Sequence, residues 1–298
     1  NRREIDGLGG LAVDDLAKLK IRPQIQELTL PRYYALFFNP NTAPALKATE
    51  VREALTLVTD KEKLLRDVLL GRGLIMNGPL HPDIAGFDQT ALGDREFSPE
   101  KARTLLENKG WKTDEFGVRS KKMGKDTVTL SFELIVPQID FLVKAAQVVA
   151  ADWKTIGAEL TPIVLAPNEI TNSVIKSRDY QILLFGNILK NSPDVFSFWH
   201  SSERFRPGLN LSFYESKTAD TLLESIRTDT SEDKRTADLK KLQAIIAADR
   251  PVIFLFSPNY LYASPRALGG FSKTFIAKPS DRLSGIGSWY LKTTRVLK

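Results

Sequence analysis

The sequence contains no cysteine, which excludes disulfides, thiol catalysis and cysteine-ligated zinc. It has only two histidines, His81 and His200, and no Gly-x-Ser-x-Gly segment. The two histidines lie far apart in the sequence and no carboxylate stands at ligand spacing from either, so the pattern predicts neither a metal site nor a catalytic triad. We therefore expect no cofactor, no bound transition metal and no enzyme activity.

Long apolar runs are also missing. No run approaches the roughly 18 apolar residues that suggest a membrane-spanning helix, and the longest candidate, Val252–Phe256, has the length of a strand. The first four residues are polar and contain no signal-peptide core. Either the protein is cytosolic or a leader has been removed, and these residues do not choose between the two.

Positive charge is not concentrated in any one part of the chain. The net charge is +6, from 42 Lys and Arg against 36 Asp and Glu, and the cations are scattered among acids, as in Asp60-Lys61-Glu62-Lys63. A nucleic-acid-binding surface would gather its cations into a patch or stripe. We expect a solvated basic surface and no nucleic-acid partner.

Segments with strand periodicity alternate with segments of helical periodicity, which is typical of an α/β architecture. Val128–Val136 has apolar residues at every second position, and Phe141–Ile156 repeats them at helical spacing before Gly157. Further strands are expected at Tyr33–Asn39, Glu159–Leu165, Tyr180–Phe185 and Val252–Phe256. The predicted core includes Leu55, Leu105, Leu130, Phe132, Val149, Trp153, Leu183 and Phe185.

The order and spacing of several short motifs resemble the extracellular solute-binding proteins, family 5, which include oligopeptide- and dipeptide-binding components of ABC importers. The resemblance runs from about Tyr33 to near the end of the chain. The motifs that carry it, in chain order, are Val51-Arg52-Glu53-Ala54-Leu55, Thr59–Leu64, Gly78-Pro79, Pro99–Leu106 with Gly110-Trp111, Ala145–Leu160, Ser192-Pro193-Asp194 with Trp199, and Ala248–Leu255.

The resemblance implies one lobe of a type II periplasmic-binding-protein-like fold, with a mixed sheet flanked by helices. In that family the block that begins at Tyr33 follows some 200 or more residues, whereas about 30 precede it here. The resemblance therefore implies a chain without its N-terminal lobe, which would come from the same gene or a separate chain. We expect residues 1–30 to be a remnant of the first lobe, 31–228 the ligand-binding second lobe, and 229–298 a return segment that completes the first lobe.

The resemblance also implies a function. We expect a periplasmic or extracellular substrate-binding component of an ABC importer that captures a peptide or another small polar solute between two lobes and meets the permease subunits. A lipid anchor at a missing N-terminus is a further expectation. The alternative is a truncated or repurposed lobe that acts as a sensory or interaction module.

Ligand contacts are expected on loops that follow strands, because open α/β sheets bind ligands at strand ends. The first such loop contains Gln138 and Asp140, and Asp140 is equally well placed to cap the helix that follows. The third contains Trp199, His200 and Asn210, where Trp199 is either a stacking surface for a ligand or a core residue.

The second loop contains Gly186, Asn187, Leu189 and Lys190. Peptide-binding members of the family carry an acid here that grips the peptide's amino group, but this chain has no acid in the loop before Asp194. A peptide held by its amino terminus is therefore less expected, and Lys190 is placed to attract a carboxylate or phosphate. We expect the loops at Gln138, Asn187 and Trp199 to converge on one wall of the binding site.

Overall fold

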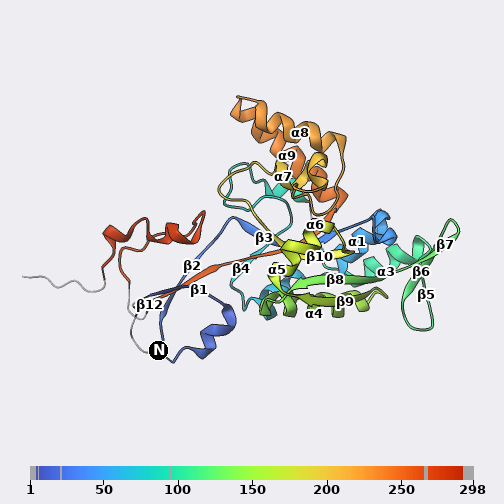
Figure 1. The fold of residues 1–298 in the computed structure, drawn as a ribbon, viewed down its shortest axis with the longest axis horizontal. Helices are drawn as coiled ribbons and strands as arrows, with labels where there is room; N and C mark the ends of the chain where they lie inside the picture. Colours follow the sequence, from blue (N-terminus) through green and yellow to red (C-terminus); the bar gives the residue numbers. More distant parts are fainter. Residues whose placement is uncertain (1–4, 6, 21, 94–95, 265–267, 291–298) are drawn as a thin grey trace, which may run out of the picture.

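The computed structural model, which describes residues 5, 7–20, 22–93, 96–264 and 268–290, is organised around a six-stranded mixed sheet of order β4-β11-β3-β10-β8-β9 (Figure 1). β10 runs antiparallel to β3 and parallel to β8, and β8 runs parallel to β9. The strands are β3 (Arg32–Phe38), β4 (Gly73–Ile75), β8 (Ser131–Pro137), β9 (Glu159–Leu165), β10 (Ile182–Ile188) and β11 (Val252–Pro258).

Helices cover both faces of this sheet because its central strands are apolar on both sides. In β3, Leu36 and Phe38 pack on one face, while Tyr33, Ala35 and Phe37 pack on the other. The first face is covered by α1 (Thr49–Val58), α3 (Pro99–Asn108) and α4 (Asp140–Lys154). The second is covered by the continuous helical segment α5 (Pro167–Glu169), η5 (Ile170–Val174) and α6 (Ile175–Ser177), by α7 (Phe196–Trp199), and by α8 (Lys217–Thr228) and α9 (Glu232–Asp249).

This arrangement confirms the expected mixed sheet flanked by helices. The predicted core is largely confirmed as well, because local periodicity correctly identified the buried faces. Leu105 and Phe185 are only partly buried and pack against the edge of the core. The fully buried ones are Leu55, Leu130, Phe132, Val149, Trp153 and Leu183, each at most 2% exposed.

The segment 128–136 forms parts of two strands rather than the single strand that its alternation predicts. β7 (Asp126–Thr129) belongs to a separate three-stranded antiparallel sheet with β5 (Lys112–Thr113) and β6 (Arg119–Met123), which projects from one end of the molecule (Figure 1). Leu130 lies at the junction, where its N–H donates to the Arg119 carbonyl and its own carbonyl accepts from the Glu159 N–H. The chain changes sheets at Leu130 without losing the period-two pattern.

A third sheet has the order β1-β12-β2 and lies apart from the six-stranded sheet (Figure 1). Its strands are β1 (Leu8–Leu11), β2 (Gln24–Leu28) and β12 (Tyr260–Ser264), accompanied by η1 (Val13–Lys18), η7 (Pro279–Leu283) and η8 (Ile286–Ser288). Within the described residues, two short segments connect this sheet to the six-stranded one. Residues 29–31 lead from β2 into β3, and Asn259 joins β11 to β12.

β11 lies within the segment 229–298 that we expected to complete a first lobe. It instead pairs with β3 and β4 near the middle of the six-stranded sheet, and α9 packs on the same sheet. The change from one sheet to the other falls at Asn259, so the expected boundary at residue 228 does not coincide with a boundary between sheets. The position of this passage between sheets is set by the pairing of β3 with β11, two strands that are far apart in the sequence.

Among the described residues, no helix combines the length and the apolar character that crossing a bilayer requires.

Candidate functional site

The C-terminal ends of four strands lie on the same side of the six-stranded sheet. We call this row of strand ends the carboxyl edge. β8, β9 and β10 are parallel, and β11 has the same direction because both β10 and β11 run antiparallel to β3. The residues that follow these strands at the carboxyl edge are Gln138, Ala166, Leu189 and Asn259. β3 begins at this edge, directly after the segment 29–31 that comes from the β1-β12-β2 sheet.

The loop after β8 is exposed at the carboxyl edge. The Gln138 N–H donates to the Leu165 carbonyl at 2.8 Å, which joins the ends of β8 and β9, and the Gln138 and Asp140 side chains are exposed. Asp140 does not cap α4, because it is the first helical residue and the N-cap is Ile139. The side chain of Asp140 is therefore not used by a capping bond.

Gly186 and Asn187 lie within β10 rather than in the loop that we expected after Phe185. The strand continues to Ile188 because residues 186–188 pair with Tyr34, Tyr33 and Arg32 of β3. The Asn187 amide donates to the Tyr33 hydroxyl at 2.9 Å, and its side chain is buried. Burial raises the pKa of Tyr33, so this hydroxyl stays neutral and accepts the bond. Asn187 thus joins two strands in the interior.

Leu189 and Lys190 form the turn that follows β10. The Leu189 side chain is buried, and its N–H donates to the Pro31 carbonyl at 2.7 Å. Lys190 has a φ of +53° and an exposed side chain. Of the four residues expected in this second loop, Lys190 is the one whose side chain is presented to solvent at the carboxyl edge.

Trp199 and Asn210 are fully buried and do not line the carboxyl edge. The Trp199 ring packs against Tyr214 and Phe254, with ring centroids 6.2 and 5.8 Å away, and belongs to the core beneath the sheet. The Asn210 amide donates to the carbonyls of His200 at 3.2 Å and Tyr214 at 2.9 Å, and its oxygen accepts from the Tyr214 N–H at 3.1 Å. Both side chains are used to hold the fold.

His200 stacks on Phe196, with ring centroids 4.1 Å apart, and its Nδ1 accepts from the Ser202 N–H at 3.1 Å. Its Nε2 lies 3.8 Å from Asp220 Oδ1 and 3.5 Å from Glu224 Oε1. Within the described ranges there is no group of three or more His, Asp or Glu side chains arranged to hold a metal ion. The loops at Gln138 and Lys190 thus follow neighbouring strands at the carboxyl edge, whereas the Trp199 and Asn210 side chains are buried in the core.

Three residues at the carboxyl edge were not selected from the sequence: Arg32, Tyr34 and Ile188. Arg32 pairs with Ile188, whose side chain is 65% exposed, and Tyr34 pairs with Gly186. A Cβ on Gly186 would lie 3.0 Å from the Tyr34 ring, so glycine leaves room for the tyrosine across β10. The sequence signal was the position of Arg32 directly before a buried strand, but only an antiparallel β3 brings that strand's beginning to this edge.

Polar contacts connect the two sheets near the connecting segments. Glu27 of β2 accepts from Asn259 Nδ2 at 2.9 Å and also pairs with Arg72. Asp14 of η1 pairs with Lys144 of α4 at 2.8 Å, and the Thr29 hydroxyl donates to Asp83 at 2.5 Å. Because these bonds are polar, they can exchange with water if the sheets move relative to one another.

His81 is fully buried beside these contacts. Its Nδ1 accepts from the Asp83 N–H at 3.2 Å, its Nε2 has no hydrogen-bond partner within the described ranges, and its ring lies near Phe275. Burial lowers the pKa of His81 below its ordinary value of 6.5, although the Asp83 carboxylate acts in the opposite direction. The neutral imidazole is therefore the form that fits this site.

We expect the free energy of unfolding to decrease as the pH falls below 6.5, by at most about 1.4 kcal/mol per pH unit from this one group. The unfolded chain binds a proton as the pH passes 6.5, while folded His81 still excludes it, so acid favours the unfolded state. Urea unfolding at pH 7.5, 6.5 and 5.5 measures this slope, and His81→Gln should reduce it. His200→Gln serves as the control, and an equal reduction in both variants would contradict the assignment.

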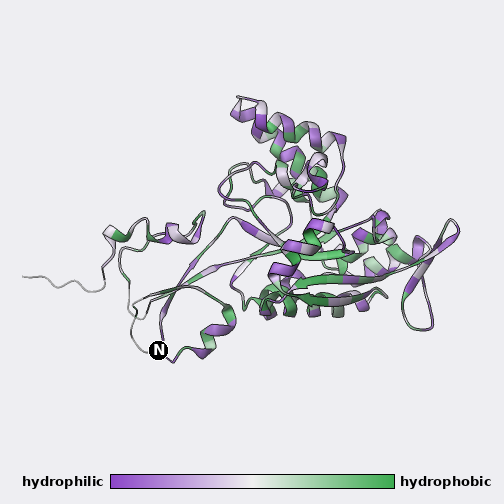
Figure 2. Cartoon of the chain, viewed as in Figure 1, coloured by the Kyte–Doolittle hydropathy of each residue, from purple (hydrophilic) through white to green (hydrophobic). Residues whose placement is uncertain are grey.

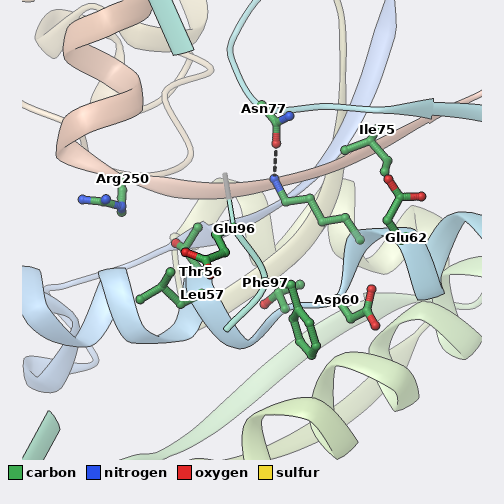
Figure 3. Close-up of a pocket in the computed structure, with 11 residues that line it drawn as sticks. Thr56, Leu57, Asp60, Glu62, Ile75, Asn77, Glu96, Phe97 and Arg250 are labelled. Atoms are coloured by element: carbon green, nitrogen blue, oxygen red, sulfur yellow. Dashed lines mark hydrogen bonds between the residues drawn. The ribbon is translucent and has the colours of Figure 1, made fainter. Parts of the chain in front are cut away.

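A pocket of about 170 Å³ lies elsewhere, between α1, the start of α2 (Lys61–Lys63) and the segment after β4 (Figure 3). The Lys61 ammonium donates to the Met76 carbonyl at 2.9 Å and to Asn77 Oδ1 at 2.8 Å, and Arg250 lies 3.5 Å from Glu53. Because its cations are held by the protein itself, we assign no ligand to this pocket. Its lining is Thr56, Leu57, Thr59, Asp60, Lys61, Glu62, Ile75, Asn77, Glu96, Phe97 and Arg250.

Comparison with known proteins adds an independent observation. Residues 1–205 match the family described as bacterial extracellular solute-binding proteins, family 5 Middle. The oligopeptide-binding protein AppA of Bacillus subtilis is 28% identical over 249 residues, which are 82% of this chain and 44% of AppA. The chain thus spans about half the length of the relatives that it matches.

The fold comparison agrees with the sequence match. The structure of AppA from Bacillus subtilis in complex with a nonapeptide superposes with a TM-score of 0.80 at 25% identity, covering 97% of this chain and 56% of AppA. NikZ from Campylobacter jejuni in complex with Ni(L-His) has the same fold, with a TM-score of 0.78 at 21% identity over 97% of this chain and 57% of NikZ. AppA is named as a binding protein, in agreement with the expectation that the chain is not an enzyme.

Proposed function

Because the chain belongs to the bacterial extracellular solute-binding proteins, family 5, we propose that it supplies one wall of a binding site for a peptide or another small polar solute. The carboxyl edge of the six-stranded sheet is this wall, and the β1-β12-β2 sheet belongs to the opposing lobe. The main support for the proposal is that residues 29–31 and Asn259 connect the two sheets beside the carboxyl edge. Two short connections beside the carboxyl edge, bridged by polar contacts, suit closure of two lobes around a ligand.

The proposal extends to the partners and location of the protein. Captured solute passes to the permease subunits of an ABC importer in the periplasm or at the outer cell surface, where a lipid anchor would hold the protein. The remainder of the first lobe comes from residues beyond this sequence or from another chain. The residues for ligand contact are Gln138, Asp140, Lys190, Arg32, Tyr34 and Ile188.

A sensory or interaction module on the same fold is the second candidate. Binding measurements distinguish the two candidates. A transport receptor releases its solute reversibly, whereas an interaction module binds a protein partner and no small solute.

A thermal-shift screen of the natural polypeptide that contains this sequence tests the proposal. Peptides of two to nine residues, sugars and metal–histidine chelates form the panel. A ligand present at a hundred times its dissociation constant raises the free energy of unfolding by about 2.7 kcal/mol. The absence of any shift across the panel would contradict a solute-binding function.

We expect Ile188→Glu to weaken binding of any solute found in this screen by about tenfold or more, because ligand closure would bury the new carboxylate at the carboxyl edge. Ile188 is 65% exposed, so the free energy of unfolding should change by no more than about 0.5 kcal/mol. Isothermal titration calorimetry and urea unfolding measure the two quantities. Phe116→Glu, at an 82% exposed position between β5 and β6, is the matched control and should leave affinity unchanged. Equal affinities for both variants would place the ligand elsewhere.

A further inference from the structure

The Arg32 guanidinium is partly buried at the carboxyl edge without any hydrogen-bonded partner among the described residues. Its Nε is inaccessible to solvent and no acceptor reaches it. An arginine carries five N–H donors, and buried polar groups are almost always hydrogen-bonded in folded proteins. The Arg32 Nε–H is therefore free to donate to a group that the described residues do not supply.

Lys190 adds a second cation, in the turn that follows the neighbouring strand β10. Arg32 pairs with Ile188 across β3 and β10, and Lys190 follows Ile188 by two residues, after the Leu189 N–H has bonded to the Pro31 carbonyl. The Lys190 side chain is exposed, and no carboxylate of the described residues forms an ion pair with it. Two cations without counter-ions among the described residues therefore lie at the start of β3 and just after the end of β10.

Two of the carboxylates near this edge have partners of their own. Glu27 is engaged by Arg72 and Asn259, and Asp14 is engaged by Lys144. Asp140 is exposed at the start of α4 and forms no ion pair with the described residues, so it is the one of these three carboxylates that stays available at this edge. Glu27 and Asp14 thus pair with residues that connect the two sheets, and they do not neutralise Arg32 or Lys190. A ligand at Arg32 and Lys190 would therefore meet positive charge.

We propose that Arg32 and Lys190 form an anion subsite within the ligand site, which receives a carboxylate or phosphate of the bound solute. The guanidinium offers paired donors that match two oxygens of such a group, and the ammonium of Lys190 supplies a movable second charge. The residues 189–193 contain no acid that would hold a ligand amine. The proposal rests on the proposed function and narrows it, because the recognised end of the solute is its anionic end.

The test compares peptides that differ only at their ends. The natural polypeptide that contains this sequence is titrated calorimetrically with peptides that have free ends, acetylated amino ends or amidated carboxyl ends, and separately with inorganic phosphate. We expect amidation to reduce the affinity about tenfold or more, and acetylation to change it less than about threefold. Binding of phosphate alone would show that the subsite accepts an oxyanion without the rest of a peptide.

Variants assign the effect to the residues. Arg32→Gln should weaken binding of the free peptide by about tenfold and leave the amidated peptide unchanged, which is the signature of a direct pair in a double-mutant cycle. Arg32→Lys should recover part of the affinity, and Lys190→Gln should have a smaller effect than Arg32→Gln. Lys109→Gln, at an exposed lysine after α3, is the control for a general loss of charge.

The outcomes separate this inference from the function on which it rests. If acetylation costs more affinity than amidation, or if Arg32→Gln weakens both peptides equally, the anion subsite is wrong while solute binding stands. The same holds if a neutral sugar binds and neither peptides nor phosphate do. If no member of the wider panel binds, the proposed function fails, and the anion subsite fails with it.

Discussion

Replacing Trp199 by alanine should lower the free energy of unfolding by about 3–5 kcal/mol, the largest loss that we expect from a single change in the third loop. The indole is fully buried between Tyr214 and Phe254, and α7, which carries it, packs on the second face of the sheet. Truncation removes this apolar contact and leaves a cavity that the surrounding core fills only in part. Urea unfolding followed by circular dichroism measures the loss.

Changes at Trp199 should affect the free energy of unfolding and not the affinity for solute. Trp199→Phe should recover much of the lost stability, and Trp289→Ala, at a partly exposed tryptophan beside Phe271, should cost clearly less. If Trp199→Ala instead weakened solute binding and left the unfolding transition in place, the indole would be a ligand platform. The burial of the ring would then have to change when ligand binds.

Asn210→Ala should cost about 3 kcal/mol, because it leaves several buried backbone groups without their partners. The amide satisfies the carbonyls of His200 and Tyr214, and its oxygen accepts from the Tyr214 N–H and from the Ser212 hydroxyl at 3.2 Å. Each buried group that loses its partner costs about 1–3 kcal/mol, and relaxation of the loop recovers part of the sum. Urea unfolding again gives the measurement.

Two further variants serve as comparisons for Asn210→Ala. Asn172→Ala, at an exposed position of η5, should stay within about 0.5 kcal/mol of the parent protein. Asn210→Asp keeps the acceptor, loses the donors and buries a charge, so it should be at least as destabilising as alanine. A small effect of Asn210→Ala together with a loss of solute affinity would overturn the structural role assigned here.

Local patterns predicted the strands and helices correctly where each element repeats its own periodicity. The alternation in β3 and the helical spacing in α4 are both set by residues near one another in sequence, since a buried face recurs every second residue in a strand and every three to four in a helix. The same local reading misplaced Asn187 and Gly186. Their strand is extended by pairing with Tyr33 and Tyr34, about 150 residues away, and no local signal contains that pairing.

The candidate site could be predicted only in part, and the reason differs from residue to residue. Gln138 and Lys190 follow strands that are recognisable in sequence, so the rule that ligands bind at strand ends reached them. The rule did not select Arg32 because this residue lies at the beginning of a strand, and only antiparallel pairing with β10 brings it to the same edge. An aromatic residue such as Trp199 has the same sequence pattern in a core and in a ligand platform, and only packing separates the two.

By itself, the sequence determined the α/β class, most of the core and the absence of thiol chemistry, because these depend on composition and on short periodic patterns. The tertiary structure decided which strand ends share an edge, where the chain passes from one sheet to the other, and which polar side chains are already used. Those properties follow from backbone pairing between segments far apart in the chain, because the register and direction of each strand pair decide which side chains are buried. That the buried Nε of Arg32 has no partner among the described residues is visible only after that pairing is known.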